Sequence, residues 1–436
     1  MKSLDFEKNI GIGTYFTKEP GIGGKLRSLP EDFIVKEIFL YPNRKENGRF
    51  IIAEVSSKNW ETHTLVRELS KRLHISRKRI SFAGTKDKRA CSTQLMSFHN
   101  VPKDKLSHIK IKEVTIKNIY SSDKPIKIGD LYGNRFEITL RNIDKDVKPK
   151  QIQNTDSYLE KHYGFPNFYG VQRFGVMRPV THIIGKHIIN GDFEKAVMGY
   201  IANPMEGENE DTYKLREELE KSYDFSKALQ SYPNSLNFEK AILNKLVIDP
   251  EDFVGALKEL PKNLLTMFVN AYQSYLFNQI LSERIRRKIS LNKAIVGDIV
   301  LPVRKNLVDY KGIMVNESNM EKVNRQVSKN NAFTSGLLLG SDSVFSRGEM
   351  GEIEYKIIEN EKVDYRDFII SEIPFLSSSG SRRPLLAALN GIHWILNNDK
   401  LNDGKQALTL KFELQKGCYA TSLLREFMKS EYARDY

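Results

Sequence analysis

The chain has 436 residues, of which 40% are hydrophobic and 28% are charged, which is enough for two globular domains with a sizeable core. Lysine and arginine total 68 against 55 acidic residues, and the net charge of +13 favours a polyanionic partner, usually nucleic acid, over a merely basic protein. The two cysteines form no CxxC pair and the eight histidines show no ligand spacing, so neither a disulfide framework nor a metal site is predicted.

The amino-terminal sequence MKSLDFEKN lacks the apolar core of a signal peptide. Nowhere does the chain contain a run of about 18 apolar residues, the length needed to span a bilayer. These two observations predict a soluble, cytoplasmic protein without a membrane partner, and we expect it to be a monomer.

Glycines are frequent near the start of the chain, in Gly11-Ile12-Gly13 and again in residues 21–24. Neither stretch completes a GxGxxG or GxxxxGK[ST] phosphate loop between a strand and a helix, so flexible turns are favoured. An RNA-modifying enzyme that uses a nucleotide cofactor here, such as a methyltransferase, is an open alternative. It predicts a required small molecule.

Strand and helix patterns follow in turn. Residues 33–38 and 50–56 have the apolar character of strands, and a helix over 61–73 places Leu65, Leu69 and Leu73 on one face. Further strands are expected at 95–98, 108–119 and 136–140. Because helices do not alternate regularly with these strands, we predict a mixed, largely antiparallel α/β (α+β) sheet, and a Rossmann domain is disfavoured.

A basic stretch at residues 81–94, SFAGTKDKRACSTQ, surrounds one carboxylate, Asp87, with Lys86, Lys88 and Arg89. Nearby opposite charges favour the ionised carboxylate, and glycine allows a short loop after a strand. Between Lys58 and Arg89 there are ten basic and three acidic residues, so this segment is expected to form an electropositive surface for phosphates. On composition alone, a solvated basic turn in which the aspartate merely balances charge is the favoured explanation.

Aromatic and amide side chains are interleaved at residues 165–175, FPNFYGVQRFG. Aromatic rings can stack on an unpaired base, and amides can read its pairing edge. Taken alone, the stretch is better explained as a buried aromatic cluster beside a turn.

The character of the chain changes between residues 181 and 382. Helices are expected at 193–201, 212–223, 238–246 and 264–285, and short strands at 298–303 and 307–315. We interpret this region as an inserted α/β domain, with SSSGS at 377–381 as its return hinge. A strand at 407–414 and a final helix through Met428, capped by Thr421 or Ser422, are predicted to complete the first domain.

Four separated blocks, at residues 27–38, 81–94, 165–175 and 408–427, resemble in order the signatures of the TruD family of tRNA pseudouridine synthases. The resemblance implies a catalytic domain of pseudouridine synthase type over 1–180 plus 383–436 and an inserted TRUD domain over 181–382. It also implies that Asp87, in a Gly-x-Lys-Asp motif, is the catalytic residue. Substrate-binding roles pass by position to Arg27, Lys86, Asn167, Tyr169 and Arg173, where Arg27 replaces a family lysine and Tyr169 a phenylalanine.

The family resemblance further implies conversion of uridine to pseudouridine at position 13 of tRNA, without a cofactor or a metal. Asp87 would attack C1′ of the ribose or remove a proton from C2′, after the base has left its stack. Arg27 would keep the carboxylate ionised and aimed. The alternative is a non-catalytic basic RNA-binding protein, for which Asp87→Asn would leave affinity and cellular effect intact.

Overall fold

The computed structural model describes residues 4–305 and 307–436, and these residues form two compact units. The first, here called the sheet unit, contains residues 17–165, 387–431 and 435–436. The second, the helical unit, contains the described residues of 4–16, 166–386 and 432–434. The expected division at 180/181 and 382/383 into a catalytic and an inserted domain stays a prediction, because contacts define compact units and not the origin of a domain.

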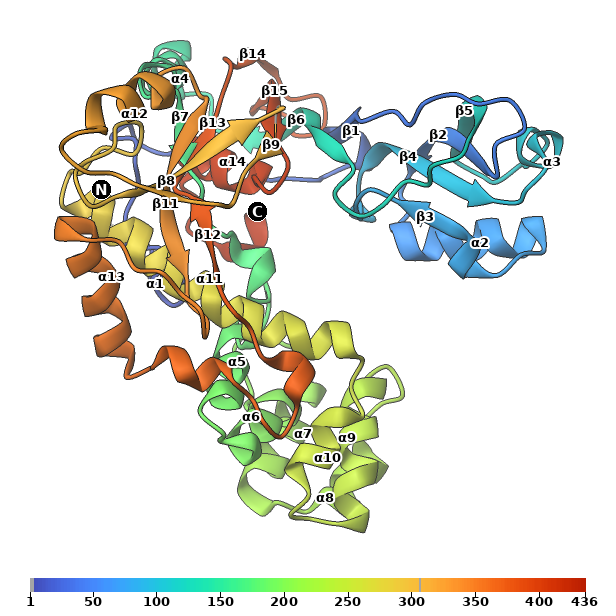
Figure 1. Cartoon of the computed structure of the whole chain (residues 1–436). Coiled ribbons are helices and arrows are strands. Elements are labelled where there is room, and N and C mark those ends of the chain that lie inside the picture. The colour runs from blue at the N-terminus through green and yellow to red at the C-terminus, as the bar shows by residue number, and fades with distance from the viewer. Residues whose placement is uncertain (1–3, 306) are drawn as a thin grey trace. The chain divides into compact units, whose positions relative to one another are not determined.

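The sheet unit is built on an eight-stranded sheet with the order β14-β15-β6-β1-β4-β2-β5, in which β3 pairs with β4 (Figure 1). Only β1 and β4 are parallel among these neighbours, so the predicted mixed, largely antiparallel sheet is confirmed. The strands are β1 (Phe33–Phe39), β2 (Phe50–Lys58), β3 (Ile80–Phe82), β4 (Cys91–His99), β5 (Val114–Ser122), β6 (Leu131–Ile143), β14 (His393–Asn398) and β15 (Gln406–Gln415).

Helix α2 (Thr62–Leu73) covers the β2–β4 part of this sheet through the apolar face expected from its sequence. Leu65, Leu69 and Leu73 are buried among Val55 and Phe98 of the strands. Each such leucine contributes about 1.5–3 kcal/mol by leaving water. This packing holds the helix beside the loop between β3 and β4, on which Asp87 lies.

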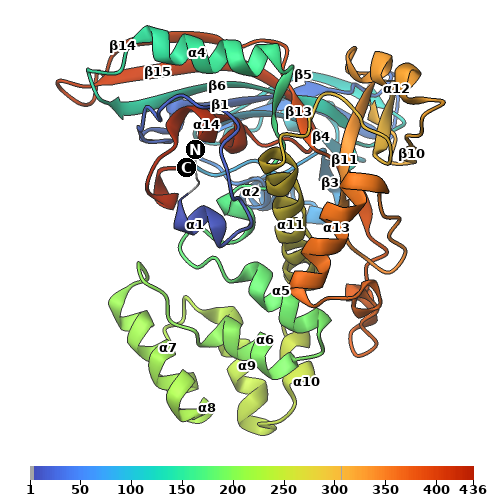
Figure 2. The same cartoon turned by 90° about the vertical axis from the view of Figure 1, so that its left-hand side faces the viewer.

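The other helices of the sheet unit lie at both ends of the sheet. Helix α4 (Pro149–Lys161) runs along these strands (Figure 2), and the indole Nε1 of Trp394 in β14 donates to Asp156 Oδ2 at 3.2 Å. Helix α14 (Ala420–Met428) contacts α4, while α3 (Lys103–Ser107) contacts β5. Tyr419 is the N-cap of α14, so the predicted cap at Thr421 or Ser422 is wrong: both lie inside the helix, because it begins one residue earlier.

Helix α11 (Lys262–Arg286) is the centre of the helical unit, where it contacts α5, α13 and the strand β11 (Figures 1 and 2). Both ends of this helix lie within two residues of the expected 264–285. The other helices are α1 (Asp5–Lys8), α5 (Thr181–Ile189), α6 (Phe193–Ile201), α7 (Glu210–Ser222), α8 (Phe225–Ser231), α9 (Asn237–Ile248), α10 (Phe253–Lys258), α12 (Met320–Val327) and α13 (Gly348–Glu361).

A second, antiparallel sheet in the helical unit has the order β10-β8-β11-β12, and β9 pairs with β8. Its strands are β8 (Ile299–Arg304), β9 (Leu307–Val308), β10 (Ile313–Met314), β11 (Ala332–Leu338) and β12 (Ser381–Pro384). Strand β12 begins at the last residue of the predicted SSSGS hinge. The short strands β7 (Gly164–Pro166) and β13 (Leu386–Ala388) lie where the chain passes between the two units.

Candidate active site

Asp87 lies on the loop between β3 and β4 in the sheet unit. Its Oδ2 accepts a hydrogen bond from Arg27 Nη2 at 2.6 Å. The Asp87 side chain is 58% exposed, whereas the Arg27 side chain is only 17% exposed. The carboxylate is thus accessible to a bound molecule, and the cation that orients it is largely covered by protein.

Arg27 is itself held in place. Its guanidinium lies over the Phe33 ring, 4.4 Å from the centroid, and its backbone has a φ of 55°, in the left-handed region that is rare for side chains other than glycine. The short 3-10 turn Pro30–Asp32 follows, and Asp32 Oδ1 forms an ion pair with Arg141 Nη2 at 2.6 Å. The Pro-Glu-Asp-Phe block therefore anchors the segment that positions Arg27.

Arg141 also pairs with Asp399, at 2.9 Å. Burial alone would raise the pKa of Asp399, but hydrogen bonds from the backbone N–H groups of Asn142 and Leu401, and from Asn402 and Arg141, outweigh it. The pKa of Asp399 is held at about 2. This network ties β6 and the residues after β14 to the turn beside Arg27, and it stays ionised at neutral pH.

Lys86, the neighbour of Asp87, is buried. Its Nζ donates to Glu37 Oε1 at 2.7 Å, and the side chains of this pair are 7% and 0% exposed. Glu37 Oε2 accepts from the Leu95 backbone N–H, and the Lys86 backbone N–H donates to Thr62 Oγ1 at 2.7 Å. The loop is thereby fastened to β1, β4 and α2, and its buried lysine acts inward, away from the exposed carboxylate.

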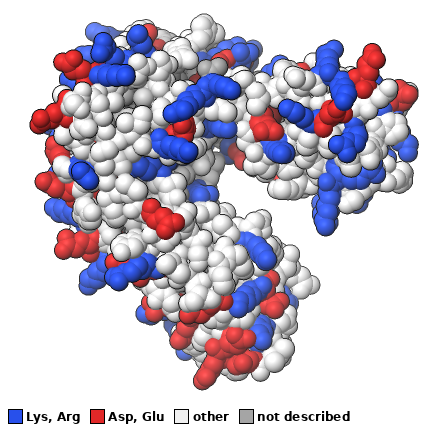
Figure 3. Space-filling view, viewed as in Figure 1, with Lys and Arg blue, Asp and Glu red and all other residues white. Residues whose placement is uncertain are grey.

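The basic segment expected between residues 58 and 89 is only partly a surface. Besides Lys86, Arg79 points to the carbonyl oxygens of His99 and Asn100 at the end of β4. Figure 3 shows Lys and Arg side chains on the displayed face of the sheet unit. Seven cations of the segment are exposed, namely Arg67, Lys71, Arg72, Arg77, Lys78, Lys88 and Arg89. Exposed guanidinium and ammonium groups at this density favour contact with phosphates.

Asn167 begins the second set of predicted site residues, in the helical unit. It is 2% exposed. Its backbone N–H donates to Leu385 O at 2.9 Å, its Nδ2 donates to Pro384 O at 3.0 Å, and its Oδ1 accepts from Arg383 Nη2 at 2.7 Å. The side chain of Asn167 therefore holds the return strand β12 and orients an arginine.

Tyr169 is 7% exposed and lies between cations and an aromatic ring. The Arg383 guanidinium is 4.1 Å from its ring centroid and that of Arg173 is 5.6 Å away, while Phe277 meets it edge to face at 5.7 Å. Asn278 of α11 accepts from the Tyr169 N–H at 2.9 Å and donates to its carbonyl oxygen at 3.0 Å. The FPNFYGVQRFG segment is thus fixed on α11, and Arg173 Nε reaches Ser274 on the same helix at 3.3 Å.

Arg383 is the residue of this set that sequence reasoning missed. Strand β12 sends successive side chains to opposite sides: Arg382 forms a buried ion pair with Glu354 at 2.6 Å, whereas Arg383 turns to Asn167 and Tyr169. The sequence did contain a signal for it, since two adjacent arginines, Arg382 and Arg383, stand where the chain was predicted to return from the inserted domain. Their partners could not be named from spacing.

The structure thus brings Asp87, Arg27 and Lys86 together in the sheet unit, and Asn167, Tyr169 and Arg173 together in the helical unit. Within the described residues, no group of three or more His, Cys, Asp or Glu side chains has the arrangement of a metal site. Nor does any helix in residues 4–305 and 307–436 have the length and apolarity to cross a membrane. The sequence suggested that Gly84 allows the tight loop between β3 and β4. Gly84 does not have a left-handed φ, so the backbone conformation of this loop does not require glycine there.

Comparison with known proteins finds relatives that match nearly the whole length of the chain. The family model for tRNA pseudouridine synthase D (TruD) matches residues 9–427. A relative from Methanococcoides burtonii, named "Probable tRNA pseudouridine synthase D", is 43% identical over 98% of this chain and 97% of its own. One with the same name from Thermococcus sibiricus is 35% identical over 98% of this chain and all of its own.

A crystal structure that carries the TruD name, from Methanosarcina mazei, superposes with a TM-score of 0.88 at 40% identity and covers 100% of both chains. Its fold is therefore the fold described above, helical unit included. Sequence, family model and structure agree that the chain belongs to the tRNA pseudouridine synthase D (TruD) family of enzymes.

Proposed function

We propose that this protein isomerises uridine to pseudouridine in tRNA, at position 13, with Asp87 as the catalytic residue. The observation that carries the proposal is the exposed Asp87 carboxylate, oriented at 2.6 Å by an arginine that is largely covered and stacked on Phe33. Such a group can reach a ribose while its direction stays fixed, and positioning of this kind is a large part of enzymatic rate enhancement. The protein acts in the cytoplasm as a monomer.

The chemistry requires the N1–C1′ bond of uridine to break and a C5–C1′ bond to form. In one route Asp87 bonds to C1′, and the electron pair of the broken bond leaves with N1 of the uracil. The uracil turns, C5 attacks C1′, and the ester bond electrons return to Asp87. Loss of the C5 proton and protonation of N1 complete the isomerisation, so hydrogen at C5 is released to water.

In the second route Asp87 removes the C2′ proton, and the C2′–H electron pair forms a C1′=C2′ double bond as the N1–C1′ bond breaks and its electrons leave with N1. After the base has turned, C5 bonds to C1′ while Asp87 returns the proton to C2′, and loss of the C5 proton with protonation of N1 completes the reaction. The two routes differ in whether the C2′–H bond is broken. Deuterium at C2′ of the target uridine slows conversion several-fold if proton removal limits the rate, and leaves the rate unchanged for attack at C1′.

The second set of residues serves the base. Tyr169 takes from the family resemblance the role of stacking partner for the unstacked uracil, and such stacking is worth about 1–3 kcal/mol. Its ring is 7% exposed with Arg173 and Arg383 over it, so the base reaches the ring only when these guanidinium groups move aside. Asn167 acts on the substrate through Arg383, and Lys86 acts through the loop that it anchors. In this proposal the catalytic domain of residues 1–180 plus 383–436 supplies the named site residues. The inserted TRUD domain of 181–382 supplies helix α11, on which Tyr169 and Arg173 are held.

The test is release of tritium from tRNA containing C5-tritiated uridine. The purified protein is expected to release tritium in plain buffer, and Asp87→Asn is expected to abolish release while tRNA binding persists. Asp123→Asn, at another exposed carboxylate that pairs with a lysine in the sheet unit, is the matched control and keeps full activity. A protein that binds tRNA but releases no tritium from any tRNA would be a non-catalytic RNA-binding protein instead.

A further inference from the structure

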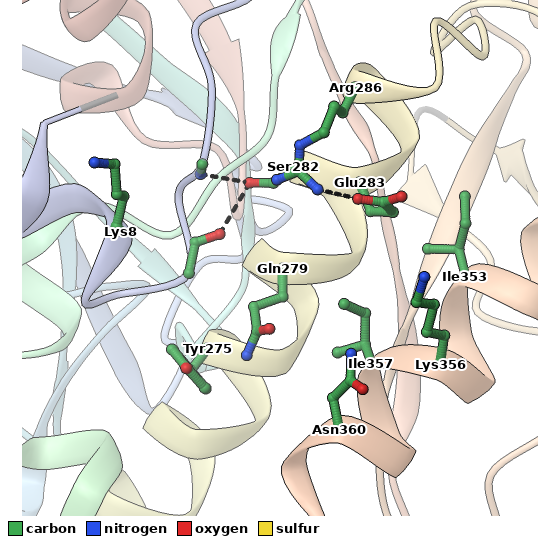
Figure 4. Close-up of a pocket in the computed structure, with 12 residues that line it drawn as sticks. Lys8, Tyr275, Gln279, Ser282, Glu283, Arg286, Ile353, Lys356, Ile357 and Asn360 are labelled. Carbon is green, nitrogen blue, oxygen red and sulfur yellow. Dashed lines mark hydrogen bonds and ion pairs between the residues drawn. The ribbon is translucent and has the colours of Figure 1, made fainter. Parts of the chain in front are cut away.

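A cavity of about 660 Å³ lies in the helical unit and takes no part in the proposed reaction. Its three walls are the amino-terminal segment from Lys8 to Gly13, one face of α11 and one face of α13 (Figure 4). A volume between about 300 and 1,000 Å³ is usual for pockets that bind small molecules. The cavity is therefore large enough for one nucleotide.

The first wall is backbone. Gly11 has a φ of 80°, and a Cβ there would lie 2.7 Å from the Tyr275 carbonyl oxygen, while a Cβ on Gly13 would lie 2.9 Å from the Arg286 guanidinium. Ser282 Oγ fastens the segment to α11, donating to Gly11 O at 2.9 Å and accepting from Gly13 N–H at 2.8 Å. The Gly-Ile-Gly stretch thus lines a cavity, although its sequence completes no phosphate loop.

Two amide side chains, those of Gln279 and Asn360, line the cavity. Gln279 Nε2 donates to the half-buried Glu361 at 2.9 Å, and Tyr275 OH donates to the same carboxylate oxygen at 3.1 Å. Burial would raise the pKa of Glu361, but hydrogen bonds from Lys186 and Gln279 outweigh it and lower the pKa, so the anchor stays charged. The orientation of Gln279 is thereby fixed, and together with Asn360 it offers the groups that read a base edge.

The outer part of the cavity is charged. Lys8, Arg286 and Lys356 line it together with a single carboxylate, Glu283. Glu283 pairs with Arg286, and its other oxygen accepts from Arg287 at 3.1 Å, so it braces both guanidinium groups. Lys8 also pairs with the exposed Asp5 at 2.6 Å, so Lys356 and Arg286 are the cations best placed for a phosphate. A carboxylate beside them suits ribose hydroxyls, as in nucleotide sites of other folds.

We propose that this cavity binds one nucleoside monophosphate unit, with the phosphate at Lys356 and Arg286 and the base against Gln279, Asn360 and the apolar wall of α13. Ile353 and Ile357 supply that wall. The unit comes either from a free nucleotide or from a residue of the bound RNA. Tyr169 is not one of the residues that line this cavity, so the two sites are distinct.

Binding of AMP, GMP, CMP, UMP and inorganic phosphate to the full chain is to be measured by calorimetry, and binding of tRNA by filter retention. At least one mononucleotide is expected to bind with a Kd of about 1 mM or below. Lys356→Ala and Arg286→Ala weaken that binding by about tenfold or more, the loss expected for a hydrogen bond to a charged group, and Lys356→Arg restores it. Lys322→Ala, an exposed lysine of α12 outside the cavity, is the matched control.

The two sources give different results. If the free nucleotides do not bind but Lys356→Ala weakens tRNA binding by tenfold or more, the unit belongs to the RNA. The proposal is overturned if neither measurement responds to Lys356→Ala and Arg286→Ala, or if inorganic phosphate binds as tightly as every mononucleotide. Asp87→Asn leaves nucleotide binding unchanged, so this outcome is independent of the proposed catalysis.

Discussion

Replacement of Arg27 tests whether catalysis by Asp87 depends on the orientation that Arg27 gives to its carboxylate. Arg27→Ala removes the 2.6 Å hydrogen bond to Asp87 and the contact with the Phe33 ring at 4.4 Å. Because the Asp87 side chain is 58% exposed, water screens the ion pair, and its share of the folding stability is about 0–1 kcal/mol. The ring contact adds about 0.5–1 kcal/mol, so the variant folds.

The effect on catalysis is expected to be larger than the effect on stability. A hydrogen bond to a charged group is worth about 1.5–3 kcal/mol, and the exposure of Asp87 places this bond near the lower end, which corresponds to a fall in kcat of about tenfold. The KM for tRNA changes little, because Arg27 acts on the substrate through Asp87. Arg27→Lys keeps the charge but loses the planar stacking on Phe33, and is expected to recover part of kcat.

Arg27→Gly is the informative companion variant. Both Arg27→Ala and Arg27→Gly lack the guanidinium, but only glycine adopts a φ of 55° without strain, so the glycine variant is expected to be about 1 kcal/mol more stable than the alanine variant. Their kcat values, from tritium release at saturating tRNA, should agree. A kcat for Arg27→Ala within twofold of the wild type would refute the positioning role.

Three further outcomes are expected. Tyr169→Phe is expected to keep kcat within about fivefold of the wild type, whereas Tyr169→Ala is expected to lower kcat tenfold or more because the aromatic ring is lost. Equal falls in the rate of tritium release for the two variants would show that the hydroxyl, and not the ring, is what the reaction needs. Arg383→Lys is expected to lower kcat by about tenfold, because Arg383 is bonded to Asn167 in the site. Arg382→Lys, on the opposite side of β12, is expected to lower the melting temperature and to leave kcat nearly unchanged, because Arg382 is paired with the buried Glu354. The reverse pattern would contradict a role of Arg383 in the site and of Arg382 in stability. Burial lowers the pKa of His182 to about 4 from 6.5, so the unfolded chain takes up the proton first and stability falls as pH drops from 6.5 towards 4. Urea unfolding should show a loss of about 2 kcal/mol between pH 7 and 5 that is absent in His182→Gln, and parallel pH profiles would show that His182 is not responsible.

Patterns that repeat within one element could be predicted from the sequence. The structure has α6 at Phe193–Ile201 and β15 at Gln406–Gln415, close to the ranges expected from helical and alternating spacing. The expected strand over 108–119 is wrong in its first half, because the structure places β5 at Val114–Ser122. Ile109 and Ile111 pack against the core under α2, and Ile111 forms only an isolated bridge with Val114. Their burial produces an alternating apolar pattern although they lie outside the strand.

Elements and partners that depend on distant contacts could not be predicted. The edge strand β14 is mostly exposed and has weak alternation, and only its register with β15 identifies it. Arg383 is 216 residues away from Asn167 in sequence, and no local pattern connects them. The neighbours Lys86 and Asp87 show the same limit: both are charged residues of one loop, yet only the position of Glu37 makes the first of them an anchor.

The buried pair of Lys86 and Glu37 explains how an exposed carboxylate can be held firmly. A carboxylate that must meet a ribose cannot be buried, and an exposed loop of small and charged residues is ordinarily mobile. The ion pair of Lys86 and Glu37, with 7% and 0% exposure, lies at the residue before Asp87, and the Leu95 N–H that donates to Glu37 helps to offset the cost of burying its charge. The Lys86 backbone N–H donates to Thr62, which fastens the loop to α2. The reactive group then needs only Arg27 to fix its direction, and it remains open to the substrate.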